Sequence, residues 1–324
     1  MIILPTNPTE NTVYIHDGVR YIYKNQLWKV GQSLSEARSV AKVSELRIGI
    51  TPTLFNADLI TSSDTLYIHR YNGNSIALYD SDSAKWSLYG LPASPLSFSF
   101  STIVPDRLHD VYLYHIGGEF AVEFLAWQDN LTAPARGLQD GTRVRNGFPN
   151  RKYIGTILTS ETIQNQVQNR HGSTALTKLN AVEQSPRQGF INMYNRVPTP
   201  YVLKFSDGFA ENTGGNWKFP EGYSSNAAMT VLNVDYQLAE CNFSLYVPEG
   251  ATTDISASMS IGSTTPSVYS GLVTRTGTGE FTGSSAYNAR ISSAGTHRLY
   301  YLTNSTVADT VNAGNGGFIV TVLQ

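Results

Sequence analysis

Short stretches of alternating apolar and polar residues run along this chain, the pattern of strands that bury one face of a sheet. Residues 13–16 and 19–23 are two such stretches, and Asp17-Gly18 between them favours a tight hairpin turn. A third stretch ends at Val30. Residues 1–30 therefore predict a small β module. A sheet of this size is marginally stable alone, so we expect it to pack on another domain, subunit or protein.

The pattern changes in residues 31–59, which predict a helical linker. Ser33-Leu34-Ser35-Glu36 matches a capping box at a helix start. Leu34, Ala37 and Ala41 then recur at helical spacing. This narrow stripe fits a brief trimeric coiled coil, and it fits equally well a connector helix docked on its own domain.

Residues 60–200 predict a central β-rich domain, because short strands alternate with turn residues such as Asn72-Gly73. A polar run at residues 159–188 interrupts this domain and predicts an exposed loop or arm. Ser185-Pro186-Arg187-Gln188 has the composition of a helix start, and Pro198 would end that helix.

Residues 201–324 predict a second β domain, in which Gly, Ser and Thr clusters separate about eight strands, the number that a jelly roll requires. The predicted fold class is therefore all-β. We expect a small N-terminal β module, a central β-rich domain with one short helix, and a C-terminal jelly-roll-like β-sandwich.

Composition narrows the functional classes. The chain has 324 residues, enough for two or three domains, and its formal net charge of −2 gives no field that would attract nucleic acid. No stretch approaches the length of a membrane span, so we expect no membrane insertion. Cys241, the one cysteine, cannot form an internal disulfide. The N-terminus lacks the features of a signal peptide, which predicts a protein made in the cytoplasm.

Residues that could carry chemistry are few. The six histidines are scattered and lack the spacing of metal ligands. Glu119 and Glu123 would share one strand face, where paired carboxylates could perform glycosidase chemistry, although a solvated or interfacial strand face explains them better. No nucleotide-binding or hydrolase motif is present. The sequence predicts no catalytic residue, no metal and no cofactor, and hence a protein that is not an enzyme.

Basic residues concentrate at Arg143, Arg145, Arg151 and Lys152. They lie at strand ends rather than in a basic stripe with stacking aromatics, so pairing with carboxylates across a subunit interface explains them better than nucleic acid does. Tyrosines on the predicted strands could stack on sugars or fill a subunit interface, and both interpretations stay open.

The segment Arg151-Lys-Tyr-Ile-Gly-Thr156, followed by Tyr194-Asn-Arg-Val-Pro-Thr-Pro200, resembles a signature of tailed-bacteriophage virion structural proteins: an R-x-Y-x-G-T strand and a Y-N-R-V-x-x-P helix end. The similarity is strongest in residues 60–200. Members of that family are fibres, decoration proteins or tail components, and they are commonly trimeric. The polar run at residues 159–188 is longer than the family's connection, and the position in the virion stays open.

The resemblance implies a non-enzymatic virion protein, assembled in the host cytoplasm, that attaches to the particle by its N-terminal part and displays the sandwich outward. Implied partners are its own copies in a homotrimer, other virion proteins of the capsid, portal or neck, or tail, and a host surface glycan as a further candidate. The alternatives are a glycan-binding receptor-recognition protein and a polysaccharide-degrading tail enzyme. The candidate interface residues are Tyr21, Tyr23, Trp28, Arg151, Tyr153, Tyr194 and Arg196.

Overall fold

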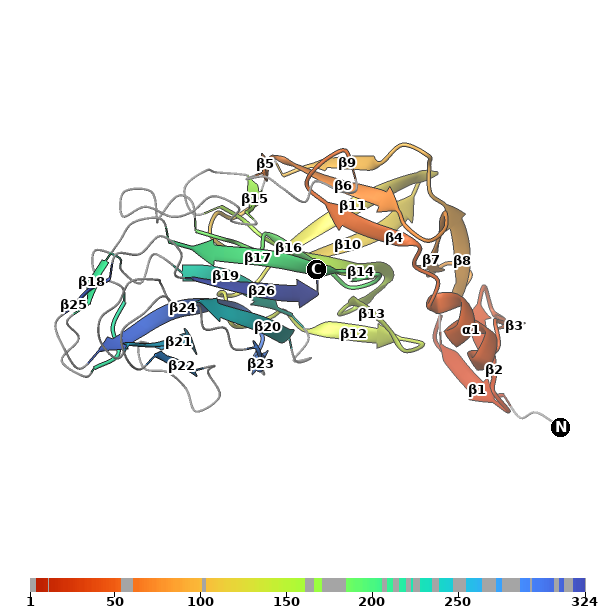
Figure 1. The fold of residues 1–324 in the computed structure, drawn as a ribbon. Coiled ribbons are helices and arrows are strands. Elements are labelled where there is room, and N and C mark those ends of the chain that lie inside the picture. Colours follow the sequence, from red (N-terminus) through yellow and green to blue (C-terminus); the bar gives the residue numbers. More distant parts are fainter. Residues whose placement is uncertain are drawn as a thin grey trace.

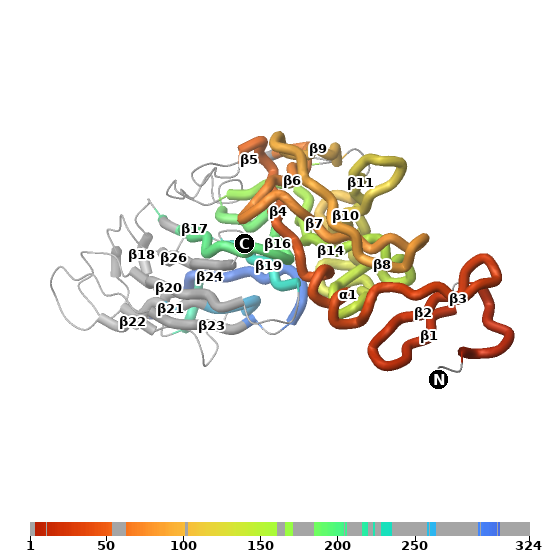
Figure 2. The backbone as a smooth tube through the Cα atoms, turned by 90° about the vertical axis from the view of Figure 1, so that its right-hand side faces the viewer, coloured from red at the N-terminus to blue at the C-terminus, as the bar shows by residue number. Residues whose placement is uncertain are grey.

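The computed structural model confirms the all-β prediction: antiparallel sheets and one short helix make up the described residues (Figure 1). The N-terminal module and the C-terminal sandwich lie on opposite sides of the central domain (Figures 1 and 2). The described residues are 4–10, 12–53, 61–100, 103–160, 166–170, 185–205, 209–211, 216–219, 223, 228–234, 239–246, 255–263, 272–275, 286–291, 293–305, 309–311 and 317–323. None of the helical segments among them is both long and apolar enough to cross a bilayer.

The N-terminal module is a three-stranded sheet of β1 (Val13–His16), β2 (Val19–Lys24) and β3 (Leu27–Val30). Asp17 and Gly18 both have positive φ, 47° and 74°, as the predicted two-residue hairpin turn requires. Asn25 and Gln26 repeat this geometry at the second turn, with φ of 52° and 63°.

Ser33 caps helix α1 (Leu34–Ala41): its hydroxyl accepts the Glu36 amide at 3.3 Å. Ala37 and Ala41 are fully buried among residues of the central domain. Of the two interpretations left open by the sequence, the helix is therefore a connector docked on its own chain.

The central domain stacks a six-stranded sheet on smaller sheets, with one apolar core between them. The large sheet has the order β11-β10-β14-β13-β12, and β16 also pairs with β14. Its strands are β10 (Leu108–Ile116), β11 (Glu119–Ala126), β12 (Arg136–Gln139), β13 (Thr142–Arg145), β14 (Phe148–Leu158) and β16 (Phe190–Asn192). The smaller sheets contain β4 (Leu46–Gly49), β5 (Thr61–Ser63), β6 (Thr65–Arg70), β7 (Ser75–Asp80), β8 (Lys85–Gly90), β9 (Leu96–Ser99) and β15 (Val167–Asn169).

The linker is shorter than the predicted residues 31–59. Strand β4 pairs with β6, and its Leu46 and Ile48 belong to the central core. The central domain thus begins before residue 60, because an alternating strand follows the helix almost at once.

The helix predicted from Ser185 to Pro198 is wrong. Residues Phe190–Asn192 form β16, which pairs with β14, and all three are buried. Apolar spacing suggested a helix, but an edge of β14 was available and strand pairing prevailed. At Gly189 a Cβ atom would collide with the Gln168 carbonyl, so the chain passes here in close contact with another strand.

The exposed arm predicted at residues 159–188 is also wrong where the structure describes it. Thr159, Asn169 and Gln188 are buried, and Arg170 and Arg187 exchange two backbone hydrogen bonds of 2.8 and 2.9 Å. Residues 161–165 and 171–184 lie outside the described residues.

The C-terminal domain confirms the predicted sandwich and has the topology of a jelly roll. One sheet has the order β17-β26-β20-β23 and the other β19-β24-β21-β22. When these eight strands are numbered 1 to 8 along the chain, the two orders become 1-8-3-6 and 2-7-4-5, which are the strand orders of a jelly roll. The strands are β17 (Pro198–Lys204), β19 (Ala228–Asn233), β20 (Ala239–Tyr246), β21 (Ile255–Ile261), β22 (Leu272–Arg275), β23 (Ala286–Ile291), β24 (Gly295–Ser305) and β26 (Gly317–Leu323), with β18 (Phe209–Glu211) and β25 (Asp309–Val311) paired separately. The Phe205 and Tyr301 rings, 5.4 Å apart, join the two sheets.

Candidate interaction surfaces

Four aromatic side chains occupy one face of the N-terminal sheet. Tyr14 pairs with Tyr21 and Tyr23 with Trp28, and paired residues of an antiparallel ladder point to the same face. The Tyr23 and Trp28 rings lie 5.4 Å apart, edge to face. All four are partly exposed, whereas the opposite face buries Arg20. We call Tyr14, Tyr21, Tyr23 and Trp28 the N-terminal aromatic face; such rings bury large areas on binding at low entropic cost.

A buried ion pair holds the module on the central domain. The Arg20 guanidinium pairs with the Asp140 carboxylate, and their side chains are 4% and 6% exposed. Arg20 also donates to the Ala84 carbonyl at 3.3 Å, and the Trp86 indole N–H donates to Asp140 at 2.9 Å. Burial raises the pKa of the nearby Tyr79 phenol, which therefore stays neutral.

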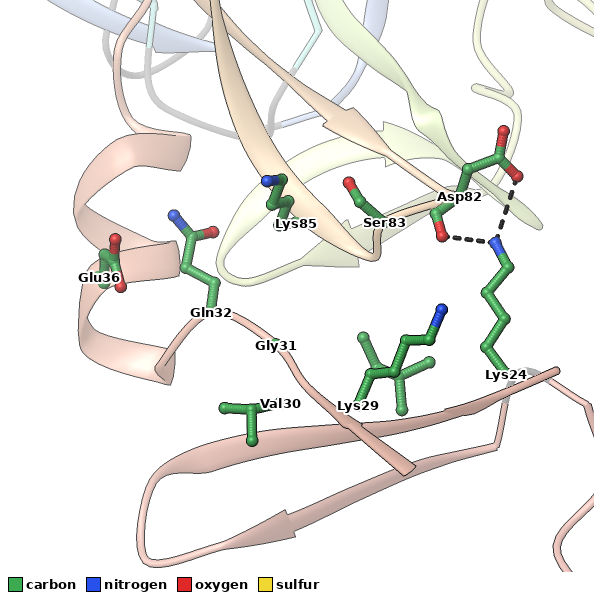
Figure 3. Close-up of a pocket in the computed structure, with 10 residues that line it drawn as sticks. Lys24, Lys29, Val30, Gly31, Gln32, Glu36, Asp82, Ser83 and Lys85 are labelled. Atoms are coloured by element: carbon green, nitrogen blue, oxygen red, sulfur yellow. Dashed lines mark hydrogen bonds and ion pairs between the residues drawn. The ribbon is translucent and has the colours of Figure 1, made fainter. Parts of the chain in front are cut away.

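A cleft of about 450 Å³ lies between the module and the β7–β8 turn (Figure 3). Its lining includes Lys24, Lys29, Lys85 and Gln32. The Lys24 ammonium group donates to the Asp82 carbonyl and lies 3.5 Å from the Asp82 carboxylate, which is 98% exposed. Only part of the module's inner face is thus in dry contact with the rest of the chain.

A second partly exposed surface lies on the central sheet. Arg151 stacks over Tyr114 at 3.9 Å, and Arg145 stacks over Phe148 at 4.2 Å. Both guanidinium groups form ion pairs with Glu123, Arg151 at 2.8 Å. The carboxylate that pairs with these arginines therefore comes from the same chain. Glu119 and Glu123 share a face as the sequence indicated, but Glu123 is held by two cations.

Lys152 points to the opposite face and is fully buried. Its ammonium group donates to the carbonyls of Ala41 at 3.0 Å, Val43 at 2.8 Å and Ala77 at 3.1 Å. The first two carbonyls lie at the C-terminus of α1, where a cation is favoured. Burial lowers the pKa of Lys152 to about 7. Lys152 thus ties the linker helix to the central sheet.

The predicted interface residue Tyr153 is inside the chain. It is 0% exposed, the Arg136 guanidinium stacks over it at 4.2 Å, and its hydroxyl hydrogen bonds Thr156 at 2.7 Å. Arg136 in turn forms a two-pronged ion pair with Asp110, at 2.7 and 2.8 Å. A side chain without solvent contact cannot meet another subunit on this surface, so the structure assigns Tyr153 to the interior.

Asp110 is the centre of this network, and the sequence reasoning missed it. Besides Arg136, its carboxylate accepts the Trp127 indole N–H at 2.8 Å, the Thr156 hydroxyl at 2.9 Å and the Tyr112 hydroxyl at 3.1 Å. Burial, with the Asp110 charge, raises the pKa of Tyr112 above its usual range, so that phenol remains a donor. The one available signal was an aspartate directly before the apolar stretch Val111–Leu113, within a strand that is mostly buried.

Tyr194 and Arg196 also make contacts within the chain. The Tyr194 ring lies 5.1 Å from the Lys152 ammonium group and packs on the central core. Arg196 donates to the Asn192 carbonyl at 2.6 Å. Between them, the Asn195 amide donates to the carbonyls of Ser44 at 2.7 Å and Leu46 at 3.0 Å.

The histidines with described surroundings have structural contacts. His109 is 2% exposed, its Nε2 accepts the Val104 amide at 3.2 Å, and burial lowers its pKa to about 4. His115 shares that strand face, and its ring lies 4.4 Å from the Tyr89 ring at a tilt of 34°. Within the described ranges, no three His, Cys, Asp or Glu residues gather as metal ligands would.

No protein-family model matches this chain, and neither does any curated protein. Among solved structures it is similar to one of the infectious bursal disease virus Gx strain, at 12% identity and a TM-score of 0.25, over 94% of this chain and 63% of that one. A VP2 subviral particle of the same virus matches at 12% identity and a TM-score of 0.26, over 84% and 74%. An exo-β-1,3-galactanase from Phanerochaete chrysosporium matches at 12% identity and a TM-score of 0.21, over 94% and 75%. The chain spans less than two thirds of the first of these.

Proposed function

We propose that this chain is a non-enzymatic structural protein of a tailed-bacteriophage virion. It attaches to the particle through the N-terminal aromatic face and presents the jelly-roll sandwich outward. The observation that carries the proposal is the placement of the N-terminal module that bears this face, on the far side of the central domain from the sandwich (Figure 1). A protein built to join one partner and display a domain needs its two ends to be separated in this way.

The phage-like signature supports the proposal because its two halves meet in space. Gly155 of the first half pairs with Asn192, just before the second half. A Cβ atom at position 155 would lie 2.5 Å from the Ile191 carbonyl and 2.7 Å from the Ile48 side chain. The glycine of the signature is therefore required by packing between β14, β16 and β4.

The proposed partners are other virion proteins of the capsid, portal or neck, or tail, and two further copies of the chain in a homotrimer. The central-sheet residues Arg145 and Arg151 are partly exposed, at 26% and 22%, and are available to a neighbour. Their Glu123 ion pairs orient them for such a contact.

Gold labelling of intact particles tests the proposal. Antibody against this chain is expected to mark one fixed place on purified virions, and its absence from them would overturn the proposal. In full-length chains, Trp28→Ala is expected to abolish incorporation into particles. Leu27→Ala, which removes a 64% exposed side chain from the other face of the same sheet, is the matched control and is expected to retain it.

Glycan recognition is the second candidate, because tyrosine and tryptophan rings that are exposed together can stack on sugars. A glycan array would then show binding by the parent chain and loss in Trp28→Ala. The polysaccharide-degrading alternative predicts new reducing ends when host glycans are incubated with the protein.

A further inference from the structure

The six-stranded sheet ends on β11, and no described strand pairs with its outer edge. The direction of each β11 backbone group follows from its pairing with β10. The Trp127 amide donates to the Leu108 carbonyl at 2.8 Å, and antiparallel ladders alternate between bonded and non-bonded pairs. The N–H and C=O groups that point outward are therefore those of Phe120, Val122, Phe124 and Ala126.

The protection of this edge against pairing with another strand is limited to the charges of Glu119 and Glu123. Edge strands usually carry lysine, proline or a bulge. The β11 sequence, Glu-Phe-Ala-Val-Glu-Phe-Leu-Ala, has no lysine or proline, and its register with β10 is unbroken. All its side chains keep some solvent exposure, and Figure 2 shows β11 at the rim of the central domain.

We propose that two copies of this chain pair their β11 strands antiparallel across a two-fold axis at Val122. Charge selects this register. With Val122 opposite its own copy, Glu123 faces Ala121 and Glu119 faces Leu125. A shift to the next bonded register sets Glu123 opposite Glu123 in one direction, or Glu119 opposite Glu123 in the other. Like charges directly opposite each other destabilise a ladder.

The side chains of the two faces also fit this pairing. Phe120 of one copy lies opposite Phe124 of the other, and aromatic cross-strand pairs are stabilising. Both rings are already held: Phe124 packs on Phe100 at 5.4 Å and Phe120 on Tyr89 at 6.3 Å. On the other face, Glu123 keeps its ion pairs with the arginines of its own chain.

The contact is independent of the proposed function and of a threefold assembly. It joins single chains into dimers, or trimers into hexamers, so the solution mass is expected to be an even multiple of the chain mass. Sedimentation analysis at micromolar concentration measures it. A purely monomeric or trimeric protein would overturn the edge contact, and it would leave the labelling of virions unaffected.

Charge variants test the register. Ala121→Glu places like charges opposite each other twice across the axis and is expected to weaken self-association about tenfold or more. Ala121→Lys has a side chain of similar length and opposite charge, and it is expected to retain or strengthen association. Equal effects of the two variants would rule out the proposed register. Near-ultraviolet circular dichroism checks that both chains fold.

Two further measurements address the backbone. Val122→Pro removes an N–H that points outward, so the β10–β11 ladder stays intact while edge pairing is blocked; Val122→Ile is its control. By residue-resolved amide exchange, the Phe120, Val122 and Phe124 amides are expected to become slower with rising concentration. The Ala121 and Glu123 amides, bonded to β10 in every state, are expected not to change. Concentration-independent exchange at Val122 would contradict the contact.

Discussion

The central domain holds its two neighbours in different ways. It shares with the sandwich a dry apolar cluster, to which Trp127 contributes from one side and Val234 from the other. Backbone bonds also cross, such as the Thr296 amide to the Asn130 carbonyl at 3.0 Å. The N-terminal module has instead one buried ion pair, the Ile22 side chain and an open cleft. The sandwich is thus fused to the centre by a shared cluster, while the N-terminal module contributes no residue to the central core.

The largest expected effect is at the fused junction. Asp110→Asn removes the charge that compensates Arg136, whose third nitrogen donates to the Val234 carbonyl at 2.9 Å. Leaving a buried guanidinium without its partner is expected to lower the free energy of unfolding by about 4 kcal/mol, measured by urea denaturation. Asp64→Asn, at an exposed carboxylate, is the control. An unchanged midpoint in Asp110→Asn would show that the network is not what fuses the two domains.

Removing Lys152, which ties helix α1 to the central sheet, has the next largest expected effect. Lys152→Met leaves the Ala41, Val43 and Ala77 carbonyls without their donor and is expected to cost about 2 kcal/mol of stability at neutral pH.

The same residue gives a pH dependence whose sign is fixed. Its pKa falls from 10.5 in the unfolded chain to about 7 in the folded one, so between these values the unfolded chain binds the extra proton. Raising the pH from 7 towards 10.5 is therefore expected to stabilise the parent relative to Lys152→Met. Parallel stability curves for the two chains would contradict the assignment.

At the N-terminal junction the expected effect is local. Arg20→Met is expected to speed amide exchange in the module by about tenfold or more, because opening it no longer breaks a buried ion pair. The urea midpoint of the main transition is expected to stay unchanged, because Asp140 keeps its Trp86 and Gln139 donors and meets water once the module opens. Arg38→Met, on the exposed side of α1, is the matched control. A shift of the whole transition would mean that the module is as firmly integrated as the sandwich.

The smallest expected effect is at the cleft. Lys24→Ala breaks the contact with Asp82, whose carboxylate is almost wholly in water. Exposed pairs of this kind contribute little, so module exchange is expected to change by less than about twofold. A larger change would show that the cleft side of the junction, rather than Arg20, holds the module.

Local chemistry made much of the fold predictable. Positive φ at Asp17 and Gly18 follows from the dipeptide itself, and the alternation of short strands indicated the sheets and the sandwich. The strand β16 was not predictable, because its apolar spacing fits a helix and only the free edge of β14 decides against one.

The buried ion pairs beneath the candidate surfaces could not be predicted from the sequence either. Asp110 and Arg136 are 26 positions apart, and Arg20 and Asp140 are 120 apart, so no local pattern joins them. Tyr153 and Arg151 are two positions apart in the sequence and lie on the same face of the sheet. Tyr153 is buried beneath Arg136, whereas Arg151 is partly exposed over Tyr114. This difference in exposure depends on which other segments cover the sheet, and the local sequence does not reveal it.

The first and last strands of the jelly roll are neighbours in the same sheet. Its first strand, β17, lies beside its last, β26, and Pro198 pairs with Leu323. A cassette with adjoining ends can be exchanged for another of different size without stretching the scaffold that carries it. A force that pulls Pro198 and Leu323 apart would break the hydrogen bonds between β17 and β26 one after another. The sandwich therefore resists force better when the force acts on other parts of its two sheets.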